Sequence, residues 1–246
     1  MMSHQLPILV PVLLLIGVVI VPLVGSRRPA VAHRLTVAIC GACFAIAVAL
    51  TMKVLRTGPI HYALGGWPPP IGIEFVADPL SVFFLLIVTG IALLVLAGSA
   101  PAVTRDTPGR TAPFFAITLA LLLGLSGIVL TGDLFNLYVF LEISSLSAYA
   151  LVSSGDDRSG VAAFRYLILG TLGASLYLLG LGFLYTVTGT LNMADMATRL
   201  DTTAAPVHIA AVMITVGMGL KMAMFPMHKW LPDAYTHASS TGTALI

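Results

Sequence analysis

The stretch Leu134-Phe-Asn-Leu-Tyr-Val-Phe-Leu-Glu142-Ile-Ser-Ser-Leu-Ser-Ala-Tyr-Ala-Leu-Val152 decides the fold of this chain. As a helix it is long enough to cross a membrane, and its single formal charge is Glu142. A second stretch of this kind, 206–225, has Lys221 as its single formal charge. An ionisable side chain in hydrocarbon costs at least about 2.5 kcal/mol, so it normally faces protein, water or an opposite charge. The pair therefore indicates an ion or proton path, and the alternative is a static pair that joins two helices.

The composition excludes a soluble globular protein. Of the 246 residues, 58% are hydrophobic and 9% are charged, whereas soluble domains carry about 25% charged residues. Apolar runs of roughly 20 residues, each able to span the bilayer, recur along the chain. These runs are Leu6–Val24, Leu35–Leu55, Pro79–Ala100, Thr111–Thr131, Leu134–Val152, Ala162–Val187 and Pro206–Phe225. We therefore expect an all-α, polytopic transmembrane helix bundle with seven spans, and residues 241–246 begin an eighth.

We divide the chain after residue 110. Residues 1–110 hold the first three spans and a loop rich in glycine and proline, and residues 111–246 hold spans four to eight. The first run is expected to be a retained helix, because it has neither a basic leading segment nor a small-residue cleavage site.

Basic residues on alternate loops predict the orientation. Eight fall on one side: Arg27, Arg28, Arg34, Arg105, Arg110, Arg158, Arg165 and Lys229. Three fall on the other: Lys53, Arg56 and Arg199. The richer side is the cytoplasmic one, so we expect the N-terminus outside a bacterial cytoplasmic membrane.

Two connections on the outer side have clear sequence signals. The segment 57–78 is rich in glycine and proline, which favours an ordered loop of extended and turn conformations, with Tyr62 and Trp67 at the lipid–water boundary. Asp78 and Asp133 are expected to cap the helices that follow them. Only Thr131-Gly-Asp133 separates two spans, so those helices must be adjacent and antiparallel.

Helix rise places the two membrane charges at depths that differ by roughly 9 Å, more than a direct contact. Glu142 lies nine residues past Asp133 and Lys221 fifteen past Pro206, or roughly 14 Å and 22 Å deep. The lysine stem and a helix bend near Gly217, Gly219 and Pro226 could close much of this offset. Because hydrocarbon disfavours lone charges, separation of the partners should favour the neutral form of each, and movement would thereby release a proton.

Polar side chains near this pair could order a proton-carrying chain of water. Tyr138, Ser145 and Tyr149 share one face of the Glu142 helix, although hydrogen bonds between packed helices explain them equally well. Beyond the seventh span, His228 and His237 could pass protons to bulk water at the inner side, or simply be solvated.

The sequence offers no cofactor or metal site. Cys40 and Cys43 form a C-x-x-C inside an apolar helix without further cysteines or nearby histidines, so packing explains them best. We find no motif for a nucleotide, a covalent nucleophile or a redox centre. We expect a transporter subunit rather than an enzyme.

Two segments resemble a known family, the antiporter-like subunits shared by Mrp-type monovalent cation/proton antiporters and the membrane arm of complex I and related hydrogenases. They are Thr131-Gly-Asp-Leu-Phe-Asn-Leu-Tyr-Val-Phe-Leu-Glu142 and Gly219-Leu-Lys-Met-Ala-Met-Phe-Pro-Met-His-Lys-Trp-Leu-Pro-Asp-Ala234. Residues 65–73, 76–78 and 188–195 are most similar to the D subunits of Mrp antiporters.

The resemblance implies a fold of about fourteen helices in two inverted five-helix repeats, each with a broken helix. It also implies a large multisubunit complex. The family's essential glutamate matches Glu142, and the lysine of its broken helix matches Lys221. Because the second repeat is missing after Ile246, we expect a fragment or one half of a split subunit that does not transport alone.

Three functions remain open at this point. The first is a proton-translocating subunit of a Na⁺(K⁺)/H⁺ antiporter, whose partners are other membrane subunits. The second is the non-redox, proton-pumping part of a complex I-like NADH:quinone oxidoreductase or a membrane-bound hydrogenase. The third is an assembly subunit, for which the change Glu142→Gln would leave activity intact.

Overall fold

The computed structural model describes residues 5–26 and 28–246. Within these ranges, six helices are long and apolar enough to cross a membrane, which confirms the predicted helical membrane bundle. They are α1 (Leu6–Gly25), α2 (Pro29–Thr57), α3 (Pro79–Gly98), α5 (Thr111–Leu130), α6 (Leu134–Val152) and α7 (Ser159–Thr188). A shorter apolar helix of 17 residues, α9 (Ala205–Lys221), occupies the seventh predicted span.

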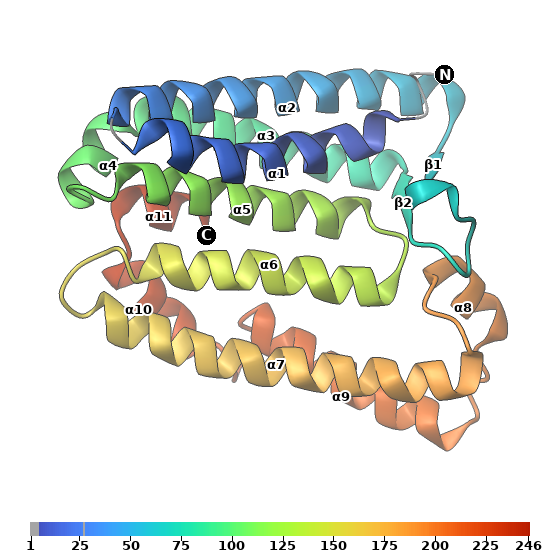
Figure 1. Cartoon of the computed structure of the whole chain (residues 1–246). Coiled ribbons are helices and arrows are strands. Elements are labelled where there is room, and N and C mark those ends of the chain that lie inside the picture. Colours follow the sequence, from blue (N-terminus) through green and yellow to red (C-terminus); the bar gives the residue numbers. More distant parts are fainter. Residues whose placement is uncertain (1–4, 27) are drawn as a thin grey trace.

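The long helices and α9 lie alongside one another, and most of the short elements gather at the two ends of the bundle (Figure 1). One end, called the hairpin end below, carries three small elements: β1 (Ile60–Ala63), β2 (Glu74–Ala77) and α8 (Met193–Arg199). The opposite end, called the α4 end, carries α4 (Ala100–Asp106) and α10 (Trp230–His237). Two further short helices are η2 (Leu64–Gly66) and α11 (Ser240–Leu245), the latter at the predicted start of an eighth span.

Helix α5 forms the centre of the packing. It contacts α1, α2, α3 and α6, and most of its residues are buried, as expected of a helix that is apolar on all sides. The main hydrophobic core runs from Val10 through Phe75 and Phe115 to Leu151. By contrast, α1, α3 and α7 expose rows of large apolar side chains, as a lipid-facing surface requires.

Two predicted helix caps are confirmed. A carboxylate oxygen of Asp78 accepts the amide of Ser81 at 2.7 Å, and one of Asp133 accepts the amide of Asn136 at 2.7 Å. Asp133 starts α6 directly after α5, so these helices are adjacent as predicted. A Cβ at Gly124 of α5 would lie 2.5 Å from the backbone nitrogen of Ser144 on α6, which shows how closely the two backbones approach.

The predicted ordered loop, residues 57–78, contains a two-stranded antiparallel sheet that the sequence analysis described only as extended. Ile60 pairs with Ala77, and Ala63 pairs with Glu74. Backbone hydrogen bonds tie this hairpin to other segments: Gly132 donates to Glu74, and Met193 donates to Gly132. The hairpin, the α5–α6 turn and the start of α8 therefore form one hydrogen-bonded unit.

Several predicted helix limits differ from those observed. Helix α2 begins at Pro29 rather than Leu35, because hydropathy marks the apolar part of a helix and not its polar first turns. Helix α9 ends at Lys221, four residues before the predicted Phe225. The backbone leaves the helix at Ala223, whose φ is +50°, and the Phe225–Pro226 peptide bond is cis. Such a break agrees with the broken helix that the resemblance implied.

Two sequence-based statements about the whole chain stay predictions. The division after residue 110 and the orientation with the N-terminus outside are not tested by the fold. Of the basic residues behind that orientation, Arg27 lies outside the described residues.

Candidate functional site

Glu142 and Lys221 meet inside the bundle. Nζ of Lys221 donates to Oε1 of Glu142 at 2.7 Å and to Oγ of Ser145 at 2.8 Å. The lysine side chain is 7% exposed and the glutamate side chain 24% exposed. Sequence reasoning expected an offset of roughly 9 Å along the helices, yet the contact is direct. The two charges are therefore paired, and most of their surface is shielded from solvent.

Lys221 owes its position to the break in α9. It is the last residue of the helix, where the backbone dipole is negative and stabilises a cation. Beyond it, the amide of Met224 donates to Gly219 at 2.9 Å instead of to Leu220, its partner in a continuous helix. The break thus places an ammonium group at a helix terminus within the bundle.

Close packing of α7 holds α9 at this point. A Cβ built on Gly217 would lie 2.5 Å from the carbonyl oxygen of Gly173, and one on Gly173 would lie 2.8 Å from that of Gly217. Small residues of this kind let membrane helices approach each other closely. The crossing lies one turn before Lys221 and fixes the approach of that residue.

The polar side chains predicted to lie near the charged pair make different contacts in the structure. Ser145 contacts Lys221 directly, as given above. Tyr138 stacks on Tyr177 with ring centroids 6.4 Å apart, and no hydrogen bond joins it to Glu142 among the described residues. Ser144 and Ser147 donate to backbone carbonyls of their own helix. Of these hydroxyl groups, only that of Ser145 touches the charged pair.

The two histidines have different surroundings. Nδ1 of His237 lies 2.9 Å from a carboxylate oxygen of Asp156, in the connection between α6 and α7. Nδ1 of His228 is buried and has no hydrogen-bond partner within the described part of the chain. His228 also stacks on Phe225 in the segment that follows the break. Over residues 5–26 and 28–246, no hydrogen bond joins either histidine to the charged pair.

No group of three or more metal-ligating side chains occurs in the part of the chain that the structure describes. Cys40 and Cys43 are buried free thiols in α2.

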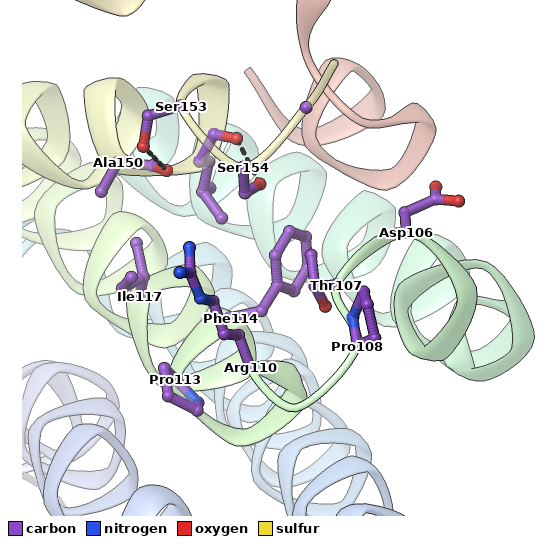
Figure 2. Close-up of a pocket in the computed structure, with 12 residues that line it drawn as sticks. Asp106, Thr107, Pro108, Arg110, Pro113, Phe114, Ile117, Ala150, Ser153 and Ser154 are labelled. Carbon is purple, nitrogen blue, oxygen red and sulfur yellow. Dashed lines mark hydrogen bonds between the residues drawn. The ribbon is translucent and has the colours of Figure 1, made fainter. Parts of the chain in front are cut away.

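A cavity of about 490 Å³ at the α4 end is lined by Arg110, Phe114 and neighbouring residues (Figure 2). The hydroxyls of Ser153 and Ser154 there donate to backbone carbonyls. None of its lining residues belongs to the charged pair.

Sequence reasoning missed a buried acid at the hairpin end. The side chain of Glu74 is 9% exposed. Its Oε1 accepts Nδ2 of Asn192 at 2.7 Å, and its Oε2 lies 3.1 Å from Nδ1 of His61. A single acid within the otherwise apolar segment Ile73-Glu-Phe-Val-Ala77 was the available signal. Glu74 thus joins the hairpin to the start of α8 through side chains as well as backbone.

These features define the class of protein: a polytopic helical membrane protein with a partly buried acid–base pair at a broken helix. Residues 131–246 match the model of the family described as NADH:quinone oxidoreductase/Mrp antiporter, TM. The matched range contains both Glu142 and Lys221.

Named relatives come from both branches of this family. The chain is 47% identical over 258 residues to the N subunit of the NADH-quinone oxidoreductase of Desulforudis audaxviator, covering all of this chain and 50% of the relative. It is 34% identical over 249 residues to the D subunit of a probable K⁺/H⁺ antiporter of Rhizobium meliloti, covering 95% and 44%. The solved Mrp complex from Dietzia sp. DQ12-45-1b contains a similar chain, with a TM-score of 0.86, 28% identity and coverage of 100% and 46%. The chain thus spans about half the length of the curated relatives it matches.

Proposed function

We propose that this chain is a proton-translocating membrane subunit of a multisubunit Na⁺(K⁺)/H⁺ antiporter, and that the proton moves through Glu142 and Lys221. The observation that carries the proposal is the direct contact of these side chains at the break in α9. The similarity to the D subunits of antiporters supports the cation-linked branch. Monovalent cations and protons are the proposed substrates.

The contact explains how movement could be linked to protonation. While Nζ of Lys221 stays 2.7 Å from Glu142, each charge stabilises the other. Separation removes this attraction, which is worth about 4 kcal/mol at 4 Å with an effective dielectric constant near 20. The lysine then releases its proton or the glutamate takes one up, and either step moves a proton along the path.

The arrangement in the membrane belongs to the same proposal. The hairpin end faces outside and the α4 end faces the cytoplasm, as the distribution of basic residues predicts. Residues 111–246 form the first of two inverted repeats, and partner membrane subunits surround it. Tyr138 and Ser145 contribute to the proton path, and His228 and His237 lie near its inner exit.

A second function is favoured by one specific comparison. The 47% identical relative is named as a subunit of an NADH-quinone oxidoreductase. In such a complex the same pair would move protons at the expense of electron transfer in other subunits, without a redox centre in this chain.

The experiment uses everted membrane vesicles that hold the native complex with an acid interior. We add a pulse of Na⁺ or K⁺ and follow the internal pH by fluorescence. The antiporter proposal expects alkalinisation that Glu142→Gln and Lys221→Gln abolish. Matched controls are Asp157→Asn and Lys229→Gln, which change exposed residues of the same charge type and should leave transport intact.

Two other results would overturn this proposal. Proton pumping that begins only with an electron donor, without a response to Na⁺ or K⁺, identifies the redox-linked function instead. Cation-dependent alkalinisation that persists in both Glu142→Gln and Lys221→Gln shows that the pair is a structural link between helices.

A further inference from the structure

The break in α9 weakens the backbone hydrogen bonding of the Leu220 carbonyl, which accepts the amide of Ala223 at a long 3.4 Å. In a continuous helix the carbonyl of Leu220 would accept the amide of Met224, but that amide donates to Gly219. A buried carbonyl without a good donor is unfavourable. Here the indole Nε1 of Trp230 donates to the Leu220 carbonyl at 3.0 Å. Trp230 is 4% exposed, so this hydrogen bond is shielded from water.

The indole ring is itself held by aromatic contacts. Trp230 stacks on Tyr166 of α7, with ring centroids 3.9 Å apart and planes 6° apart. Tyr166 then forms a T-shaped contact with Tyr149 of α6, with ring centroids 4.4 Å apart. Contacts of this geometry favour a fixed ring position. A Cβ on Gly170 would collide with the Tyr149 hydroxyl, so that glycine makes room for the last ring of the column.

The column leads back to the charged pair. Tyr149 lies one helical turn after Ser145, on the same face of α6. Ser145 in turn accepts Nζ of Lys221 at 2.8 Å. The lysine is therefore held at both ends: Trp230 holds the carbonyl of the residue before it, and Glu142 and Ser145 hold its ammonium group. One connected set of contacts runs through α10, α7 and α6.

We propose that Trp230 is a positioning residue for Lys221. Its indole N–H replaces the helical donor lost at the break, and the column formed by Tyr149, Tyr166 and Trp230 keeps the lysine within reach of Glu142. Loss of the indole donor lets the end of α9 shift, so Lys221 spends less time paired and its protonation equilibrium changes. This inference rests on the proposed proton transport by Glu142 and Lys221.

The test uses Trp230→Phe in the assembled native complex, because phenylalanine keeps an aromatic ring and lacks the N–H. The matched control is Trp67→Phe, which changes the chain's other tryptophan, an exposed residue of the hairpin-end loop. The first measurement is hydrogen–deuterium exchange of residues 219–229. We expect faster exchange in this segment for Trp230→Phe and none of this change for Trp67→Phe.

The second measurement is the pH profile of transport, at equal amounts of assembled complex. Because Lys221 is less firmly paired, we expect the profile of Trp230→Phe to shift by about half a pH unit or more. A reduced rate with an unshifted profile would show a role in folding alone and would overturn the proposal. Unchanged exchange in residues 219–229 would overturn it as well.

A second variant covers the case in which Trp230→Phe fails to assemble. Tyr166→Leu keeps the indole donor and removes the ring on which it stacks, so both measurements should change in the same direction. If Tyr166→Leu changes neither measurement, the aromatic column does not position Lys221. The exchange measurement does not depend on transport, so it judges the position of the lysine even if Glu142→Gln proves the proposed function wrong.

Discussion

Gly217 of α9 lies against the carbonyl oxygen of Gly173 on α7, and a Cβ at either position would collide with the backbone of the other helix. We expect Gly217→Ala to destabilise the protein by about 1–3 kcal/mol, because backbones cannot move apart without losing packing along the crossing. Thermal unfolding of the purified complex measures the change. The control is Gly182→Ala in α7, where a new Cβ meets open space. That change should be neutral or stabilising by up to about 1 kcal/mol, and equal losses in both variants would contradict the prediction.

The charged pair predicts strong coupling between two substitutions. Glu142→Gln or Lys221→Met alone leaves a shielded charge without its partner, which costs about 3–5 kcal/mol for a fully buried pair. Glu142 keeps 24% of its side-chain surface exposed, so we expect the lower end of that range. The double variant should be more stable than the sum of its parts predicts. Unfolding midpoints of the four proteins give the coupling energy, and additive effects would show that the contact contributes little.

Glu74 should hold the hairpin end together. Glu74→Ala removes the acceptor of the Asn192 amide group and the partner of His61, so we expect a loss of about 1–3 kcal/mol. Glu74→Gln keeps an acceptor oxygen and should cost less. Limited proteolysis of residues 64–73 measures the effect, because the loop between the strands becomes accessible when the hairpin detaches. Equal cleavage of Glu74→Ala and the parent protein would count against this role.

The contact between Asp156 and His237 predicts a pH dependence. The hydrogen bond from His237 lowers the pKa of Asp156 below its ordinary value of 3.8. A lowered folded-state pKa means that the contact stabilises the fold at pH values above 3.8, and that this contribution is lost as the pH falls through the lowered pKa. Amide protection at Asp156, corrected for intrinsic exchange, should therefore decrease under acid conditions. His237→Ala should remove this dependence, and an unchanged acid transition in that variant would refute the assignment.

Hydropathy and capping rules predicted the parts of the fold that depend on one segment at a time. The apolar runs became the long helices, Asp78 and Asp133 cap α3 and α6, and the short connection at Gly132 made α5 and α6 neighbours. Each of these features follows from the environment that a residue needs, whatever its distant neighbours are. Helix α4 lies in a polar connection that has no such signal, so the sequence analysis did not predict it.

Sequence reasoning named the two charged residues of the candidate site but not the geometry of their contact. The cost of lone charges in hydrocarbon singled out Glu142 and Lys221, but 79 residues separate them, and their direct contact depends on how α9 breaks. The roles of Trp230 and Glu74 were not predicted. A tryptophan that donates to a distant carbonyl, and an acid that meets its partners across a hairpin, are defined by tertiary contacts that no local pattern encodes.

The position of Glu142 near the middle of α6 has an electrical consequence. With the membrane field falling across the helix, a proton that reaches the pair from either side crosses roughly half of the transmembrane voltage. Moving one elementary charge through 100 mV is worth about 2.3 kcal/mol, so half of that voltage is worth about 1.2 kcal/mol and changes occupancy about sevenfold. In an energised membrane, the protonation of Glu142 and Lys221 would therefore respond to voltage as well as to the difference in proton concentration.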